Sequence, residues 1–195
     1  MLKKFLLITF FVNVIIIVGC ATVEKQRTIH DTDIEPDTAI TLQLGYPDTV
    51  LRVATLNLAH GRKDSINQLF VGEDAFRDNL NDIAEVLTQY KPHVVALQEA
   101  DEESRWSGNF DHVEYLASAA GYPWRSHESN AANWLFSFGT AVLSVLQVTE
   151  TIKHTFESSP PTLDKGFVLA QIDWPYGDGK QSRKLDILSV HLDFS

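Results

Sequence analysis

The sequence of 195 residues contains a single cysteine, and only 16 basic side chains against 26 acidic ones. One sulfur cannot close a disulfide within the chain or supply a cysteine-based zinc site, so both are excluded. The formal net charge of -10 argues against a protein that holds nucleic acid through a sheath of Lys and Arg. The hydrophobic share of 44% is normal for a globular protein, and the length predicts one domain, or at most two small ones.

The first twenty residues have the pattern of a targeting signal. Two lysines precede an apolar run over residues 5–18, which is short for a membrane span and typical of the h-region of a secretory signal. The run ends in Ile17-Val-Gly-Cys20. We therefore expect residues 1–19 to be a signal peptide, with a plain signal anchor as the alternative.

The four residues that end at Cys20 resemble the lipobox of bacterial lipoproteins, although Ile17 and Val18 depart slightly from the residues usual there. In that family the signal is cleaved before the cysteine, whose sulfur then carries a lipid. The resemblance implies lipidation of Cys20 and a location in the bacterial cell envelope, and Ala21 in the next position implies the outer membrane. The protein body need not be basic to stay there, because acyl chains supply the membrane affinity.

The folded domain is expected over residues 50–195. Residues 20–49 are polar and show no convincing period of 2 or 3.6, so we expect them to be a tether, in part packed on the domain. The domain starts with Leu51-Arg-Val-Ala-Thr-Leu-Asn57, whose alternation and branched side chains predict a strand.

An amphipathic helix is predicted after a polar loop over residues 60–72. Apolar residues at helical spacing are Phe76, Leu80, Ile83, Leu87 and Tyr90. Acidic residues suit the first turn of this helix, and Pro92 ends it. The apolar run over residues 94–97 predicts a strand that is covered on both faces. Strand, helix and strand together predict a βαβ unit, with both strands in one sheet.

The rest of the chain predicts a second helix followed by strands. Asp111 is suited to cap that helix, and Gly121 to end it. Strands are predicted over residues 140–146, 148–156, 167–174 and 185–192, with a hairpin turn between the last two. Early helices and late hairpins predict an α/β sandwich with a mixed sheet.

Three polar residues stand out at or inside these strands, namely Asn57, Glu99 and His191. Side chains at the carboxyl ends of neighbouring strands converge in a crevice. A carboxylate and an amide oxygen suit Mg²⁺ or Ca²⁺ better than zinc. Taken alone, Asn57 and Glu99 are better explained as a turn asparagine and a solvated glutamate. His191 within an apolar strand favours a shared site, because buried polar groups must be satisfied.

The chain also resembles the endonuclease/exonuclease/phosphatase superfamily of deoxyribonuclease-I-like hydrolases. The matching segments, in the family's order, are Val53-Ala-Thr-Leu-Asn57, Val94-Val-Ala-Leu-Gln-Glu99, Gly139-Thr-Ala-Val-Leu-Ser144, Lys165-Gly-Phe-Val-Leu-Ala170 and Ser189-Val-His-Leu-Asp193. The resemblance implies a four-layer α/β sandwich with two packed sheets. It also implies cleavage of phosphoester bonds with a divalent cation, usually Mg²⁺ and otherwise one such as Mn²⁺ or Ca²⁺.

The same resemblance implies roles for three residues. Glu99 would be the metal carboxylate, Asn57 would lie in the metal and phosphate shell, and His191 would bind the phosphate or assist the leaving group. Two residues that follow Asn57, His60 and Arg62, are candidates for substrate binding, since an arginine can contact phosphate bidentately. A solvated loop arginine is an equal alternative for Arg62.

Other conspicuous side chains have simpler interpretations. Trp106, Trp124 and Trp134 are better explained as partly buried packing than as a substrate rim. The acidic residues 101–103 are interpreted as a solvated face rather than a second metal site. Asp193 is expected to support the loop after its strand.

Members of the superfamily continue, after the strand that corresponds to the one holding His191, with a Gly-Asp-Phe-Asn-like segment and an Asp-His pair near the end, and neither follows Asp193 in this sequence. We therefore expect residues 50–195 to be the N-terminal portion of the fold, incomplete at its C-terminus, and to hydrolyse little or nothing alone. The alternative is a natural, non-catalytic lipoprotein module for binding or assembly on a degenerate hydrolase fold. The expected partners are a phosphoester substrate and, through the lipid, a membrane. Nucleic acid, phospholipid and inositol phosphate stay open as substrates.

Overall fold

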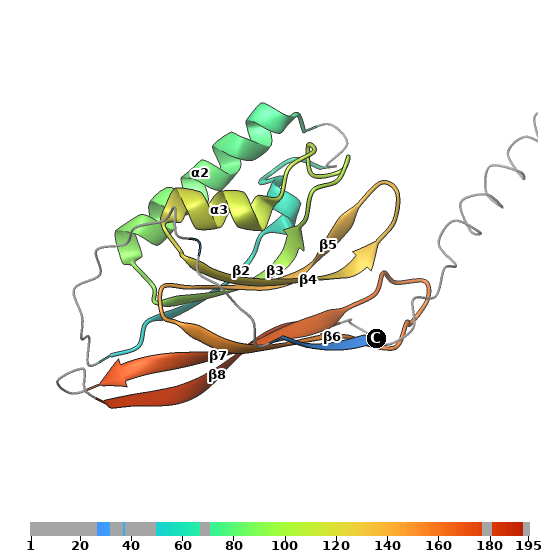
Figure 1. Cartoon of the computed structure of the whole chain (residues 1–195). Helices are drawn as coiled ribbons and strands as arrows, with labels where there is room; N and C mark the ends of the chain where they lie inside the picture. Colours follow the sequence, from blue (N-terminus) through green and yellow to red (C-terminus); the bar gives the residue numbers. More distant parts are fainter. Residues whose placement is uncertain (1–26, 32–36, 38–49, 67–70, 177–180, 193–195) are drawn as a thin grey trace, which may run out of the picture.

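Two four-stranded sheets pack face to face, and two helices cover the outer face of one of them (Figure 1). The structure is a computed structural model that describes residues 27–31, 37, 50–66, 71–176 and 181–192. The layers in these residues are helices, a mixed sheet and an antiparallel sheet. The predicted α/β sandwich with a mixed sheet is confirmed, and three of the four expected layers are present in the described part of the chain.

The mixed sheet has the strand order β2-β3-β5-β4. Its strands are β2 (Val53–Asn57), β3 (Val94–Asp101), β5 (Ser137–Ser144) and β4 (Trp124–Ala132). β2 and β3 are parallel, whereas the other two pairs are antiparallel. The predicted βαβ unit is therefore confirmed. β3 is a central strand because its apolar first half is buried on both faces.

The first helix, α2 (Glu73–Tyr90), forms where the apolar spacing predicts it. Its buried residues are Phe76, Leu80, Ala84 and Leu87. Two acidic residues lie in its first turn, where they interact favourably with the positive end of the helix dipole. Lys91, in a left-handed conformation with φ 47°, ends the helix one residue before Pro92.

The second helix, α3 (His112–Ala120), also has the predicted ends. The Asp111 side chain accepts a hydrogen bond from the backbone N–H of Glu114 at 2.8 Å, which satisfies one of the free donors of the first turn. Gly121 follows the helix with a φ of 76°, a conformation that glycine adopts without strain. α2 and α3 pack together on the mixed sheet (Figure 1).

The second sheet is antiparallel throughout, with the order β1-β6-β7-β8. Its strands are β1 (Arg27–Asp31), β6 (Val148–Thr155), β7 (Gly166–Tyr176) and β8 (Gln181–His191). β1 lies within the segment expected to be a tether, so this part of the segment belongs to the sheet. Tyr176 pairs with Gln181, which confirms the predicted hairpin pairing, while its turn over residues 177–180 lies outside the described residues.

Apolar side chains form one cluster on each face of the mixed sheet. The cluster under the helices includes Leu97, Leu116 and Leu143, and the cluster between the sheets includes Val142, Val168 and Ile172. A polar layer continues the second cluster along β4, where Asn130 Nδ2 donates to Thr155 Oγ1 at 3.1 Å. The sequence pattern did not predict β4, because its residues are mostly polar.

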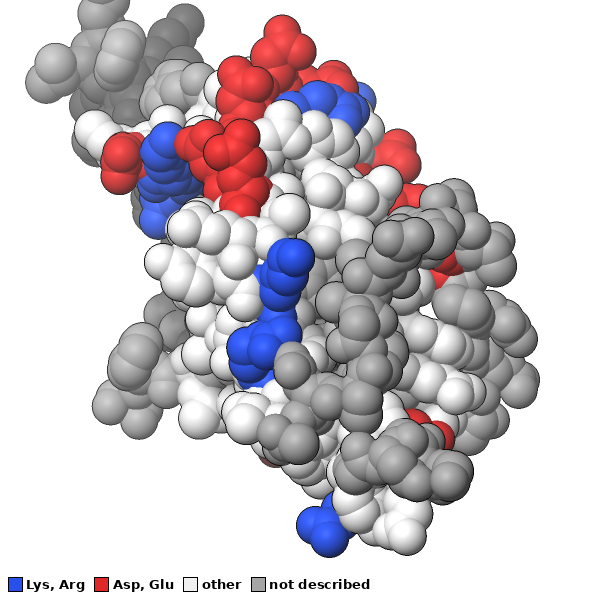
Figure 2. Space-filling view, turned by 90° about the vertical axis from the view of Figure 1, so that its left-hand side faces the viewer, with Lys and Arg blue, Asp and Glu red and all other residues white. Residues whose placement is uncertain are grey.

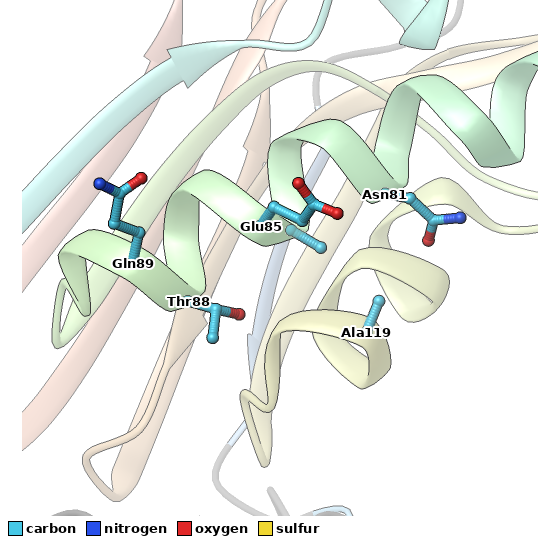
Figure 3. A pocket seen from close by; sticks show the side chains of 6 residues that line it. Asn81, Glu85, Thr88, Gln89 and Ala119 are labelled. Carbon is cyan, nitrogen blue, oxygen red and sulfur yellow. The ribbon is translucent and has the colours of Figure 1, made fainter.

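A groove of about 510 Å³ lies between the two helices, and Figure 3 shows its lining. It is lined by Asn81, Ala84, Glu85, Thr88, Gln89 and Ala119. All of these residues except Ala119 of α3 belong to α2, from its middle to its C-terminal end, which leads into the start of β3, whereas Glu99 lies near the other end of β3. The groove is therefore separate from the strand ends that carry the predicted site. Among the described helices, none is both long and apolar enough to cross a membrane.

Candidate active site

A β-bulge near the end of β3 places Glu99. The register of β3 against β5 shifts between Gln98 and Ala100, so Glu99 is the extra residue and opposes no residue of β5. Its φ is 48°, in the left-handed region that non-glycine residues rarely adopt. Bulges and strained residues of this kind re-aim side chains and cluster beside active sites.

Asn57 ends β2 and meets Glu99 across the parallel strand pair. Its Nδ2 donates to Glu99 Oε1 at 3.0 Å, and its Oδ1 accepts from the backbone N–H of Ala59 at 2.8 Å. The second bond fixes the orientation of the amide, so that its NH₂ group faces the carboxylate. The structure thus brings together two of the residues that the sequence placed at neighbouring strand ends.

His60 lies in the loop after β2, within the short 3₁₀ helix η1 (Ala59–Gly61). Its φ is 58°. Its Nδ1 lies 2.7 Å from Asp101 Oδ1, and its Nε2 lies 3.5 Å from Glu99 Oε2. The imidazole therefore bridges two carboxylates that belong to the same strand, and its side chain is only 14% exposed.

The sequence-based interpretation of residues 101–103 is wrong for Asp101, whose side chain is only 1% exposed. The bulge shifts the alternation of faces along β3. Val95, Leu97 and Ala100 therefore all join the cluster under the helices, and the side chain of Asp101 turns into the interior, where it meets His60. Glu103 is exposed, as expected of a solvated acidic face.

His191, the last residue of β8, brings an imidazole from the other sheet. Its Nε2 lies 3.7 Å from Glu99 Oε1, and its side chain is 18% exposed. Gln98 Nε2 donates to Ser189 Oγ at 3.1 Å, and Ser189 Oγ donates to the Leu97 carbonyl at 2.7 Å. These bonds tie β8 to β3 and hold His191 beside Glu99. Sequence reasoning missed Ser189 and Gln98 as supports of the site.

A third histidine, His112, packs against the loop that holds His60. His112 is fully buried, and its Nε2 lies 2.8 Å from the Ser107 carbonyl. A Cβ at Gly61, whose φ is 71°, would lie 3.1 Å from the His112 ring, so only glycine fits there without strain. Burial lowers the pKa of the His112 imidazole below its usual 6.5, outweighing the opposite effect of Asp101. The ring is therefore neutral at pH 7.

Solved structures share part of this architecture. The chain is similar to an endonuclease/exonuclease/phosphatase family protein from Leptotrichia buccalis, with a TM-score of 0.52 and 14% identity over 74% of this chain and 55% of that chain. An endonuclease/exonuclease/phosphatase from Beutenbergia cavernae has a TM-score of 0.45 and 20% identity, over 73% and 38% of the two chains. A humanized D. rerio TDP2 has a TM-score of 0.42 and 21% identity, over 74% and 48%.

The likeness at a TM-score of 0.52 concerns the fold alone, because the identity is low. It shows that the two sheets and two helices correspond to part of that fold. The chain spans 55%, 38% and 48% of the lengths of the three solved chains. No protein-family model matches the sequence, and no curated protein matches it.

The hydrogen bond of the Arg62 guanidinium lies within its own loop. Arg62 Nη1 donates to the Ile66 carbonyl at 3.2 Å. Together with Lys63, Asn79 and other residues it lines a cavity of about 360 Å³ beside the start of α2. Among the described residues, Arg62 has no hydrogen bond or ion pair with Glu99 or Asn57. Its contacts therefore do not support the prediction that it binds phosphate.

The three tryptophans considered above for a substrate rim have different surroundings. Trp124 packs partly against the core between the sheets, and Trp106 stacks edge-on to Phe136 with ring centroids 5.5 Å apart. Trp134, in contrast, is 78% exposed in the turn between β4 and β5. Packing thus explains two of the three, and Trp134 is an exposed aromatic residue.

Cys20 and Asp193 lie outside the described residues. In the part of the chain that the structure covers, no group of three or more His, Cys, Asp or Glu side chains is suited to hold a metal ion by itself. On the face shown in Figure 2, Lys and Arg side chains form separate small groups between acidic and uncharged ones. The described side chains on this face do not form a continuous basic groove.

Proposed function

We propose that these residues form part of the site of a divalent-metal-dependent phosphoester hydrolase. One observation carries the proposal: the bulged Glu99 carboxylate contacts Asn57 at 3.0 Å and lies 3.7 Å from His191 of the other sheet. These are the residues that the sequence resemblance assigns to metal, phosphate shell and catalysis. The fold likeness to an endonuclease/exonuclease/phosphatase family protein supports the same reading.

The donor set suits a hard divalent cation such as Mg²⁺. Glu99 is 23% exposed and offers a carboxylate. The Asn57 NH₂ group faces this carboxylate and can donate to it or to a phosphate oxygen, while the cation would be held by the carboxylate. Mg²⁺ is commonly held by one or two carboxylates, with waters and substrate phosphates as its other ligands. A site without three convergent protein ligands is compatible with that chemistry. A bound cation would supply positive charge against the phosphoester and polarise it.

His191 is proposed as the catalytic histidine. Its partly exposed Nε2 lies 3.7 Å from Glu99 Oε1, so a phosphoester held at Glu99 lies within reach of an imidazole donor. Donation to a phosphoryl oxygen or to the leaving oxygen stabilises negative charge as the bond breaks. The ties of Ser189 to Leu97 and Gln98 keep this imidazole in place.

We also propose that the protein is anchored in the bacterial outer membrane by a lipid on Cys20, after removal of residues 1–19. The lipobox-like sequence and the small residue Gly19 support this. Expression of Cys20→Ser in a Gram-negative host provides the test. Retention of the wild type in the membrane fraction, with release of the variant, is expected, and equal fractionation of both would contradict the anchor.

The phosphoester proposal is tested with bis(p-nitrophenyl) phosphate and the purified chain. We expect binding by saturation-transfer NMR that requires Mg²⁺ and is lost in Glu99→Gln, with little or no release of p-nitrophenol. Binding that is indifferent to Mg²⁺ would contradict the proposal. Mg²⁺-dependent release that His191→Ala abolishes would support the chemistry and overturn the expectation of inactivity. A panel of DNA, sphingomyelin and phosphoinositides then separates the substrate classes.

A further inference from the structure

His60 contacts the carboxylate oxygen that Asn57 leaves free. Asn57 Nδ2 donates to Oε1 of Glu99 at 3.0 Å, while His60 Nε2 lies 3.5 Å from Oε2. Each oxygen of the carboxylate therefore has its own neighbour, one from the last residue of β2 and one from the loop that follows it. Two polar neighbours on separate oxygens restrict rotation of the carboxylate about its last bond.

Asp101 determines which way the His60 ring faces. Its side chain is 1% exposed, and Oδ1 lies 2.7 Å from His60 Nδ1. A buried carboxylate is stable only when it is paired, and an ionised carboxylate can only accept hydrogen bonds. Nδ1 must therefore carry a proton and donate it, and this orientation turns Nε2 towards Glu99, where a proton on Nε2 as well makes the contact with the carboxylate attractive.

The backbone around the contact is strained on both sides. The φ values of Ala59, His60 and Glu99 are 45°, 58° and 48°, all in the left-handed region. Conformations of this kind cost free energy and persist where the surroundings enforce them. Here the His60 ring stands edge-on to Phe138, with centroids 4.5 Å apart, and His112 fills the space beneath the loop at Gly61.

We propose that His60 is a positioning residue for Glu99, with Asp101 as the carboxylate that orients it. The proposal replaces the expectation of direct substrate binding by His60, since one ring nitrogen is bonded to a buried carboxylate and the other faces Glu99. It rests on the proposed function, in which Glu99 is the metal carboxylate. Partners that orient a ligating side chain commonly change metal affinity by roughly 10–100-fold when they are mutated.

The test measures Mn²⁺ binding to the purified chain by electron paramagnetic resonance. In His60→Asn, the amide reproduces the Nδ1 donor to Asp101 and removes the group that faces Glu99, and asparagine tolerates a left-handed φ. Asp101→Asn keeps the side-chain volume and removes the orienting charge. We expect both variants to keep the wild-type circular dichroism and to weaken Mn²⁺ binding roughly 10-fold or more.

His127→Asn is the matched control. The His127 side chain is 10% exposed. Its ring contacts the carbonyl of Ala100, on the same strand as Glu99, at 3.1 Å, and lies 4.0 Å from Glu102, one residue beyond that strand. A general loosening of the sheet would lower Mn²⁺ affinity in this variant too, whereas the proposal predicts no change. Nitrogen-15 NMR adds a second readout, because the His60 ring should be protonated at Nδ1 in the wild type and lose that preference in Asp101→Asn.

The outcomes separate this proposal from the proposed function. Mn²⁺ binding that depends on Glu99 but is unchanged in His60→Asn and Asp101→Asn would overturn the positioning role alone. Equal weakening in His127→Asn would also overturn it. If the wild type binds no Mn²⁺ at all, the proposed function fails, and the positioning role fails with it.

Discussion

Nδ1 of His60 lies 2.7 Å from Oδ1 of Asp101, a carboxylate whose side chain is 1% exposed. The pair therefore belongs to the core and to the candidate site at once. Its imidazole also faces Glu99 at 3.5 Å, so the packing that keeps Asp101 satisfied also orders the site. Stability and ligand binding are coupled at this point of the fold.

Removal of the imidazole should be costly. His60→Ala removes this partner from the buried Asp101 carboxylate, and loss of a hydrogen bond to a charged group costs about 1.5–3 kcal/mol. We expect a loss of that order in the free energy of unfolding, measured by urea denaturation. His60→Asn, which keeps a donor, should lose clearly less. A loss below about 1 kcal/mol in His60→Ala would show that the contact behaves like a surface pair.

The helices and strands whose apolar residues recur at regular spacing were predictable from the sequence. The face of α2 that includes Phe76, Leu80 and Leu87 is buried as its spacing predicts, and Asp111 and Gly121 mark the ends of α3. The positions of Asn57 and Glu99 at neighbouring strand ends followed from the βαβ pattern. Local spacing is sufficient for these features because each depends on neighbours in sequence.

Two features were not predictable, and both depend on tertiary contacts. β4 contains polar residues such as Ser126 and Asn130, which are typical of loops in a sequence. In the fold they are buried and form hydrogen bonds with Thr151 and Thr155 of the second sheet. Asp101 looks solvated, because nothing in its local sequence reveals a bulge at Glu99 or a histidine 41 positions earlier. The only local indication of a role for Asp101 is its place two residues after Glu99, the glutamate that the sequence predicts at a strand end.

Acid should destabilise the protein through His112. Burial lowers the pKa of this imidazole in the folded chain, while the unfolded chain keeps a value near 6.5. Folding therefore favours the neutral ring, so the stability that it contributes is complete above about pH 6.5 and declines as the pH falls below it. Urea denaturation at about pH 7.5 and about pH 5.5 should show this decline.

His112→Phe is the control for that pH dependence, because it fills most of the same space and does not titrate. The variant should lose less stability than the wild type between the two pH values, although it gives up the contact with the Ser107 carbonyl. An identical pH dependence in both proteins would assign the decline to other groups.

The edge formed by β8 should promote self-association. β8 is the last strand in its sheet order, and Leu188 on it is 50% exposed. Exposed strand edges pair with other chains, and a lysine on the edge opposes this. Sedimentation velocity should show concentration-dependent association of the wild type that Leu188→Lys reduces. Ile66→Lys, at a loop residue that is 96% exposed, should leave it unchanged, and an equal effect of both would point to net charge instead.

The most direct test of the central claim is a Mn²⁺ titration of the wild type against Glu99→Gln, followed by electron paramagnetic resonance. Glu103→Gln is the matched control, since Glu103 is an exposed glutamate just beyond the end of the same strand. We expect the wild type and Glu103→Gln to bind Mn²⁺ alike, and Glu99→Gln to lose binding while its Asn57 contact and fold persist. Equal Mn²⁺ binding by Glu99→Gln and the wild type would contradict it.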